Sequence, residues 1–350
     1  MEKLNINGRP VSPEEPPYVI AEIGANHNGD MGLARKLVDV AKLCGADAAK
    51  FQSWSKNSLI SKAEYARNTE YSDKKKHFGS LEEMVAAYQL TLEQHHELAT
   101  YCQEKGIDFL SSCFSPQEVD LLDQLNVPAF KIASMDINHL TLLEHVASKG
   151  KPVILSTGMA TLAEIERALY VLRANGSGDV ALLHCISIYP PDYKDIHLRN
   201  IAMLQQTFAV PVGFSDHTFG TAVSLAAIAL GACIIEKHFT LDKDMAGWDH
   251  AISADPHELA EIVREGRHIF NALGSFTRTV SRAEEEKKKK FRRCIVIKHA
   301  GKRGEVLTLA DLDYKRPGTG IHPDEAQYVI GRQLVRDLEA DTELHWSDLG

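Results

Sequence analysis

The chain has 350 residues, an apolar fraction of 44%, a charged fraction of 25% and a formal net charge of −9. This composition is typical of a globular protein and excludes disorder as the default state. A net-acidic surface repels nucleic-acid phosphates and anionic lipid, and no apolar run approaches the roughly 20 residues of a spanning helix. We therefore expect no nucleic-acid or membrane partner. The scattered cysteines, without a CxxC pair, and the lack of a secretory signal indicate free thiols and a cytoplasmic protein.

Short apolar runs alternate with helical patterns along the first 273 residues. The predicted strands cover 18–26, 47–53, 108–114, 129–134, 152–158, 180–186, 211–217 and 234–240. Between them, apolar residues recur at steps of three and four, as in 32–45, 91–106, 161–176 and 255–270. Such alternation implies parallel strands, and eight units in about 255 residues predict an α/β fold, the closed (β/α)8 TIM barrel. An open doubly wound sheet is the alternative, but no GxGxxG motif follows the first strand.

Two segments outside these units carry expectations of their own. The longest connection, 54–90, contains EYARNTEYSDKKKHFGS, and long loops after barrel strands usually lie over the active site. The charge run at 283–290 predicts a solvated linker or the start of a helix. We therefore divide the chain into a barrel domain (1–280), a linker (281–290) and a small β-rich module (291–350). His95, His96, His139 and His145 are predicted to lie on helix surfaces.

Polar residues gather where the predicted strands end, which is where catalytic groups of this fold project. Alternate residues of a strand share a face, so the inward positions can be read from the sequence. They are Glu22, Gly24, Asn26, Lys50, Gln52, Lys131, Ser156, Gly158, Ser215, His217, Glu236 and His238, with Ser134 just beyond a strand. Polar groups at matching depths on at least six strands favour a site over isolated structural ion pairs.

Lys50 and Lys131 lie on even-numbered strands and can share a layer of the barrel. Two close ammonium groups repel each other, and a bound polyanion relieves that repulsion. Nearby serines and glycine N–H groups can complete a phosphate or carboxylate cradle. The pair therefore predicts a substrate with several negative charges, although one lysine acting as a Schiff-base nucleophile, as in aldolases, is an alternative.

His217 and His238 end the last two predicted strands. Neighbouring strands run about 4.8 Å apart, so both imidazoles can reach one ion. Two nitrogens completed by oxygens from water and substrate suit Mn²⁺, Co²⁺ or Zn²⁺, and less specifically Mg²⁺. The sequence thus predicts a divalent metal site, with Mn²⁺ first.

Several phrases of the chain resemble the sialic acid synthase family, which makes nonulosonic acids. They are AEIGANHNGD, AAKFQS, AFKIAS, ILSTGM, LLHCISIYP, GFSDH, IEKHFTLDKD and KRPGTG. The C-terminal module resembles the antifreeze-like (SAF) domain of that family. The resemblance implies condensation of phosphoenolpyruvate with an open-chain N-acylated amino sugar of the mannosamine type. It also implies a domain-swapped homodimer in which this module covers the partner's barrel.

The resemblance also implies roles for individual residues. Lys50 and Lys131, with Ser134, Ser156 and Ser215, would hold phosphoenolpyruvate, and Gly158 would belong to the substrate site. Glu22, Gln52, Tyr189 and Asp249 would face the sugar or its reacting groups. Glu22 is expected to assist addition of water, and Arg316 to reach the N-acyl group across the dimer.

Three positions near the expected sugar depart from the family pattern, namely Asp136, Ser187 and Trp248. The acceptor is therefore either N-acetylmannosamine-like or a 2,4-diacetamido-2,4,6-trideoxyhexose, as in legionaminic or pseudaminic acid synthases. A catalytically silent sugar- or ice-binding protein is a third possibility, suggested by the C-terminal module, and the barrel-mouth polar groups argue against it.

Overall fold

The structure, a computed structural model, describes residues 3–70 and 79–350. It divides into two compact units, Met1–Gly274 and Ser275–Gly350, each with its own apolar core. Residues 71–78, part of the charged connection singled out above, lie outside the described residues. None of the described helices is both long enough and apolar enough to cross a bilayer.

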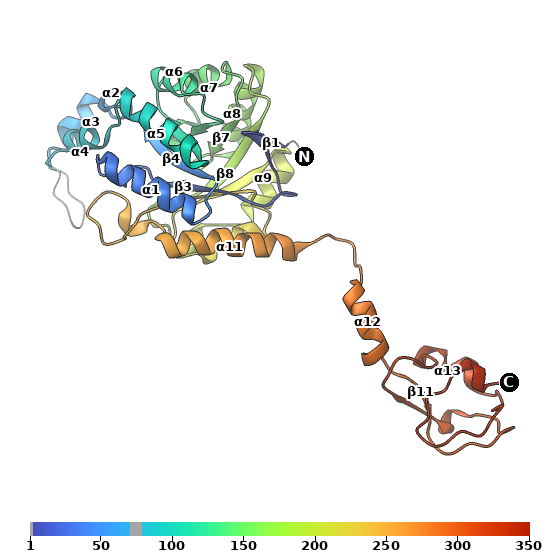
Figure 1. Cartoon of the computed structure of the whole chain (residues 1–350). Coiled ribbons are helices and arrows are strands. Elements are labelled where there is room, and N and C mark those ends of the chain that lie inside the picture. Colours follow the sequence, from blue (N-terminus) through green and yellow to red (C-terminus); the bar gives the residue numbers. More distant parts are fainter. Residues whose placement is uncertain (1–2, 71–78) are drawn as a thin grey trace. The chain divides into compact units, whose positions relative to one another are not determined.

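The first unit contains a closed barrel of eight parallel strands wrapped by helices (Figure 1). Its strands are β3 (Tyr18–Glu22), β4 (Ala48–Ser53), β5 (Asp108–Cys113), β6 (Phe130–Ile132), β7 (Val153–Ser156), β8 (Val180–Cys185), β9 (Val212–Asp216) and β10 (Ile234–His238). Pairing of β10 with β3 closes the ring. All eight lie within the predicted runs, and the TIM-barrel prediction is confirmed.

The outer helices follow the predicted amphipathic segments. They are α1 (Met31–Leu43), α5 (Leu92–Lys105), α6 (Pro116–Gln124), α7 (Leu140–Ala147), α8 (Leu162–Ala174), α9 (Asn200–Phe208), α10 (Ala222–Ala229) and α11 (Pro256–Leu273). Side-chain caps fix several of their starts: Asp30 accepts from two N–H groups of α1, and Asp255 forms a capping box with Glu258 on α11. Their buried faces pack on the outward side chains of the strands.

The amino-terminal half of the barrel interior is filled by apolar side chains. Ile20, Ala48, Leu110 and Ile154 belong to this inner cluster. A hairpin that the sequence analysis did not predict, β1 (Leu4–Ile6) with β2 (Arg9–Val11), adds its apolar residues to the same cluster. Polar inward residues therefore occupy only the carboxyl-terminal half of the barrel.

The described residues of the long connection after β4, 54–70 and 79–90, include three short helices, α2 (Lys56–Leu59), α3 (Lys62–Arg67) and α4 (Leu81–Tyr88). They share an apolar cluster with Trp54, Phe114 and Trp248, three residues that follow barrel strands. The Trp54 and Trp248 rings meet edge to face, with centroids 6.0 Å apart. This connection is thus joined to two other loops at the carboxyl end of the barrel.

The prediction that His95 lies on a helix surface is wrong. His95 is buried, and its Nε2 accepts from Ser53 Oγ at 2.8 Å while its Nδ1 donates to Thr91 O. It lies on the buried face of α5 together with Leu98 and Cys102, because residues three and four positions apart share one face of a helix. His96 and His139 are exposed, and His145 is half-buried.

The first helix of the second unit, α12 (Arg282–Phe291), is exposed and contains the predicted charge run. A Ser281–Glu284 capping box starts it, and three lysines in its last turn complement the helix dipole. Strands β11 (Cys294–Ile297) and β12 (Leu312–Lys315) form a small antiparallel sheet, followed by α13 (Ala326–Val329). The unit's own core surrounds Ile295, which suits a small β-rich module.

Candidate active site

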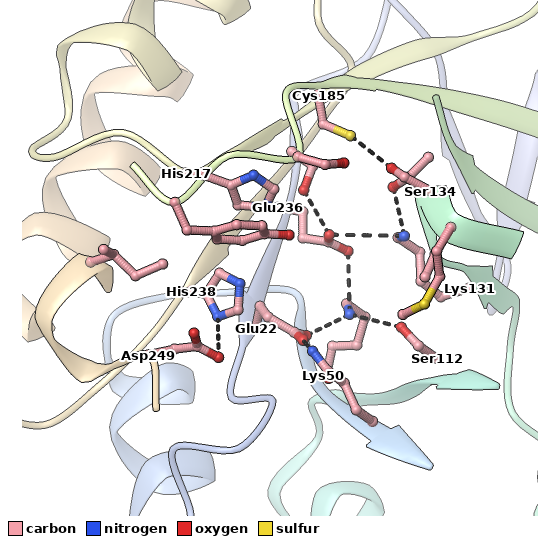
Figure 2. Close-up of a pocket in the computed structure, with 18 of the residues that line it drawn as sticks. Glu22, Lys50, Ser112, Lys131, Ser134, Cys185, His217, Glu236, His238 and Asp249 are labelled. Atoms are coloured by element: carbon pink, nitrogen blue, oxygen red, sulfur yellow. Dashed lines mark hydrogen bonds and ion pairs between the residues drawn. The ribbon is translucent and has the colours of Figure 1, made fainter. Parts of the chain in front are cut away.

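A cavity of about 520 Å³ opens at the carboxyl ends of the barrel strands (Figure 2). Most of the predicted site residues line it: Glu22, Lys50, Gln52, Lys131, Ser134, Ser156, Ser187, Tyr189, Ser215, His217, His238 and Asp249. They come from seven of the eight strands or the loops that follow them, because parallel strands place their carboxyl ends on one face. The cavity is therefore the candidate active site.

Two lysines and two glutamates form a buried charge cluster in the cavity wall (Figure 2). Lys50 Nζ lies 2.5 Å from Glu22 Oε2 and 3.6 Å from Glu236 Oε2. Lys131 Nζ lies 4.0 Å from Glu236 Oε1. Glu236 thus lies between the two ammonium groups, which share one layer as the strand numbering predicts.

Hydrogen bonds from neighbouring strands hold this cluster in place. Lys50 Nζ donates to Ser112 Oγ at 3.1 Å, and Lys131 Nζ donates to Ser156 Oγ at 2.7 Å. Ser215 Oγ donates to Glu236 Oε1 at 2.9 Å. Each charged side chain is therefore oriented by a group on the next strand, as a preorganised binding site requires.

Burial and charge shift the pKa values of the cluster in opposite directions. Burial raises the pKa of Glu22, and the nearby Lys50 only partly offsets it. Burial also disfavours the carboxylate of Glu236, but the two lysines outweigh it and lower the pKa of Glu236 to about 2. Burial disfavours the ammonium of Lys50 as well, yet Glu22 and Glu236 raise the pKa of Lys50.

The pKa of Lys131 is lowered, first by burial and then by its neighbour Lys50, although Glu236 opposes both. With all four groups ionised, the two ammonium and two carboxylate charges cancel. Lys50 and Lys131 therefore supply the positive charges with which a bound polyanion can pair, without any rearrangement of the backbone.

Two imidazoles lie beside this cluster. His217 follows β9 directly and His238 ends β10, with ring centroids 5.7 Å apart. His217 Nδ1 donates to Ile186 O at 2.8 Å, which leaves its Nε2 as a lone-pair donor. Burial lowers the pKa of both imidazoles, to about 4 for His238, so both are neutral near pH 7.

The histidine pair fits one divalent cation as a partial ligand set. In the described part of the chain, His238 Nδ1 is buried without a hydrogen-bond partner, and Asp249 Oδ2 lies 3.8 Å from it. No group of three or more His, Cys, Asp or Glu side chains among residues 3–70 and 79–350 could by itself hold a metal ion. Two neutral imidazoles would therefore need oxygen ligands from water or a substrate.

The side of the cavity around the imidazoles combines polar groups with aromatic surface. The Tyr189 ring lies against His217 at an interplanar angle of 33°, with centroids 4.1 Å apart, and burial raises the pKa of the Asp249 carboxyl. Gln52 Nε2 donates to Glu22 Oε1. Trp248 and Phe114 supply apolar wall to the same cavity. This part of the site suits a partly apolar, hydroxylated molecule.

Three predicted site residues do not line the cavity. Gly158 lies behind it, where its N–H donates to Ser134 Oγ at 3.0 Å and an added Cβ would meet Ser187 Oγ at 2.3 Å. Asp136 is largely buried near His139, and burial raises its pKa to about 6. Arg316 belongs to the second unit, where its guanidinium stacks on Phe291.

Sequence reasoning overlooked several cavity residues. Ser112 and Cys185 were given no role, although each lies at an inward position of its predicted strand, and Cys185 Sγ lies 3.1 Å from Ser134 Oγ. Glu236 was placed inward without a function. The same alternation rule, applied to every strand, also places Ser112 and Cys185 inward, whereas the role of Glu236 depends on its two lysine neighbours. Asn26, read as inward, instead anchors loops by donating to Phe239 O and Ser253 Oγ.

Comparison with known proteins agrees with this architecture. Residues 37–278 match the NeuB family, and residues 292–350 match the SAF domain. The chain belongs to the NeuB family. This confirms the resemblance in the sequence motifs and the assignment of the C-terminal module.

Members of the NeuB family align along almost the whole chain. N,N'-diacetyllegionaminic acid synthase of Campylobacter jejuni is 41% identical over 92% of this chain and 97% of its own. Human N-acetylneuraminate-9-phosphate synthase is 35% identical over 95% of this chain and 93% of its own. The crystal structure of N-acetylneuraminic acid synthetase from Leptospira borgpetersenii, in complex with citrate, superposes with a TM-score of 0.74 at 34% identity, covering 82% of this chain and 95% of that one.

Proposed function

We propose that this NeuB-family protein condenses phosphoenolpyruvate with the open-chain form of an N-acylated amino sugar. The products are a nine-carbon 2-keto-3-deoxy acid and phosphate. The observation that carries the proposal is the placement of two buried lysines around Glu236, directly beside two neutral imidazoles. One cavity thus offers a polyanion cradle and groups that can hold an oxygen-rich aldehyde.

Phosphoenolpyruvate fits the lysine side of the cavity. It carries a phosphate and a carboxylate, and Lys50 and Lys131 supply two matching cations. The hydroxyls of Ser134, Ser156 and Ser215 line the same cavity and can donate to phosphate oxygens. Release of Lys131 from Ser156, and of Lys50 from Ser112, would free N–H donors for the substrate without moving the strands.

The acceptor sugar fits between this cradle and the imidazoles. C3 of phosphoenolpyruvate attacks the aldehyde carbon with the electron pair of the C2–C3 π bond, so a carbon–carbon bond forms and positive charge develops at C2. The carbonyl π bond breaks, and its electron pair goes to the aldehyde oxygen, which takes up a proton and becomes a hydroxyl. Water adds to C2, its proton leaves, and the tetrahedral intermediate expels phosphate. Side chains that fix both substrates in line convert a bimolecular step into an effectively unimolecular one.

Glu22 is the group proposed to take the proton of the attacking water. Its carboxylate lies in the cavity beside Lys50, and its raised pKa brings it closer to neutral pH, where a general base is most effective. Gln52 holds the second carboxylate oxygen in place. Asp249 and Tyr189 are proposed to contact the sugar hydroxyls.

His217 and His238 are proposed to hold a divalent metal, with Mn²⁺ the first choice and Mg²⁺ or Co²⁺ as alternatives. When bound, such an ion would polarise the aldehyde oxygen as a Lewis acid. The neutral state of both imidazoles and the unshared lone pair on His217 Nε2 support this assignment.

Two acceptors agree with the sequence motifs, an N-acetylmannosamine-like sugar and a 2,4-diacetamido-2,4,6-trideoxyhexose. The Campylobacter relative, a diacetyllegionaminic acid synthase, is more similar to this chain than the human N-acetylneuraminate-9-phosphate synthase. The apolar wall of Phe114 and Trp248 also suits a sugar that carries methyl or acetyl groups. These observations favour the diacetamido acceptor.

We also propose a homodimer in which the C-terminal unit of one subunit covers the barrel mouth of the other. Exposed apolar side chains at the mouth, such as Met159 and Phe219, and on the C-terminal unit, such as Leu309 and Tyr328, support an interface of this kind. Arg316 of the partner subunit would then complete the sugar site. A monomer in sedimentation at micromolar concentration would contradict the shared site.

The test is phosphate release from phosphoenolpyruvate by EDTA-treated protein, with and without Mn²⁺ and with each acceptor sugar separately. We expect Mn²⁺-dependent release that requires one sugar, and near-complete loss of rate in His217→Ala with phosphoenolpyruvate still bound. The lowered pKa of Lys131 would also suit a Schiff-base aldolase. EDTA-resistant activity and borohydride trapping of the protein with substrate would support that second function and reject the first.

A further inference from the structure

Two oppositely charged residues lie directly behind the two cavity imidazoles. Asp216 precedes His217 at the end of β9, Lys237 precedes His238 on β10, and the strand register pairs Asp216 with Lys237. Because side chains alternate along a strand, these two point away from the cavity while the histidines face it. Their side chains are 0% and 1% exposed, respectively.

A closed hydrogen-bond network joins this pair to the loop after β9. Lys237 Nζ donates to Asp216 Oδ2 at 2.9 Å and to Thr218 O at 2.7 Å. Asp216 Oδ1 accepts from Thr218 N at 2.8 Å, and Oδ2 accepts from Ser224 Oγ of α10 at 2.6 Å. Both backbone groups of Thr218, the residue after His217, are therefore bonded to the pair.

The cavity side of the same strands is also fixed. Ser215 and Glu236 are paired in register and joined by a hydrogen bond of 2.9 Å. His217 Nδ1 donates to Ile186 O, which sets the orientation of its ring. Residues 215–218 are thus held from both faces of the barrel, and the outer attachment comes from the strand that carries His238.

We propose that the Asp216–Lys237 pair is a positioning device that sets the separation and orientation of the His217 and His238 imidazoles for a divalent metal. The inference rests on the metal site proposed above. A buried ion pair adds little net stability compared with an apolar pair of similar volume, whereas its directed bonds fix geometry. Groups hydrogen-bonded directly to metal ligands typically change metal affinity by about 10–100-fold when removed. The Asp216–Lys237 pair acts one residue further away, through the backbone of Thr218, so its effect should lie at the lower end of that range.

The test measures Mn²⁺ binding in the absence of substrates, by the paramagnetic resonance signal of free Mn²⁺. Asp216→Asn, Lys237→Met and the double variant are compared with the full-length wild type. We expect a dissociation constant about 10-fold higher in the single variants, with metal-free binding of phosphoenolpyruvate unchanged. Tyr18→Phe is the matched control, because it removes a partly buried hydrogen bond to Asp108 at the opposite end of the barrel.

Variants that melt earlier yet bind Mn²⁺ like the wild type would overturn the proposal, because a purely structural pair would behave in that way. If the charge variants do not fold, Ser224→Ala removes one bond to Asp216 and keeps the ion pair, and a wild-type Mn²⁺ affinity in that variant would also overturn it. His217→Ala separates the two ideas. If His217→Ala binds Mn²⁺ like the wild type, the metal site itself is rejected. If His217→Ala loses Mn²⁺ binding but the Asp216 and Lys237 variants bind it normally, only the positioning role is rejected.

Discussion

Replacing Glu236 by glutamine tests how the cavity balances its charges. The substitution keeps the shape of the side chain but leaves Lys50 and Lys131 without the carboxylate that lies between them. At separations of 3.6 and 4.0 Å, each contact corresponds to about 4 kcal/mol at an effective dielectric constant of about 20. Breaking a buried pair costs about 3–5 kcal/mol after desolvation is included, which lowers the melting temperature by roughly 10 °C.

The same substitution should increase stabilisation by phosphoenolpyruvate. A bound polyanion neutralises the two lysines in place of the missing carboxylate, so the variant should bind phosphoenolpyruvate more tightly. A tenfold gain in affinity would add about 1.4 kcal/mol to the free energy of unfolding at saturating ligand. The loss of stability that Glu236→Gln causes in the ligand-free protein should become smaller as pH rises. The pKa of Lys131 is already lowered, and it falls further without Glu236. Neutral Lys131 then removes the uncompensated charge from the folded state.

The assay is differential scanning calorimetry from pH 6 to 9, with and without phosphoenolpyruvate. Asp108→Asn is the control, because Asp108 accepts from Tyr18 and Asn7 at the opposite end of the barrel. It should lower the melting temperature without changing the increment caused by the ligand. A Glu236→Gln protein with wild-type melting temperature, or with a smaller ligand increment, would refute this account of the cluster.

Four further substitutions give separable outcomes. Glu22→Gln should lower kcat by about 10²–10⁴-fold and abolish the fall of kcat/KM at acid pH, measured as a pH profile of phosphate release. Trp248→Ala should raise KM for the acceptor but not for phosphoenolpyruvate, and an equal rise for both would contradict its placement by the sugar. For Asp136 the folded pKa is raised to about 6, so its stabilising contribution is present below its unfolded pKa and is lost as pH rises through 6. As pH rises from 5 to 8, the free energy of unfolding of Asp136→Asn should therefore increase by about 1 kcal/mol relative to that of the wild type, measured by urea unfolding. His95→Ala should cost about 3 kcal/mol in the same unfolding assay but keep the turnover rate of correctly folded protein.

The sequence alone predicts the barrel and most of the cavity lining. Apolar runs with period two and helices with period 3.6 define the eight units, and alternation along each strand places Lys50, Lys131, His217 and His238 on the inner face. These are local patterns, so a single chain displays them directly. His95 lies on the same face of α5 as Leu98 and Cys102, but only the tertiary structure shows that Ser53 satisfies its buried imidazole.

The tertiary structure decides how the inward groups pair. Glu236 is one of several inward polar residues in the sequence, and only the closed barrel places it between lysines from two distant strands. The same holds for Asp216 and Lys237, whose contact depends on the register of neighbouring strands. Ion pairs and pKa shifts depend on distances of a few ångströms and on burial, and residues far apart in sequence acquire both only when the barrel closes.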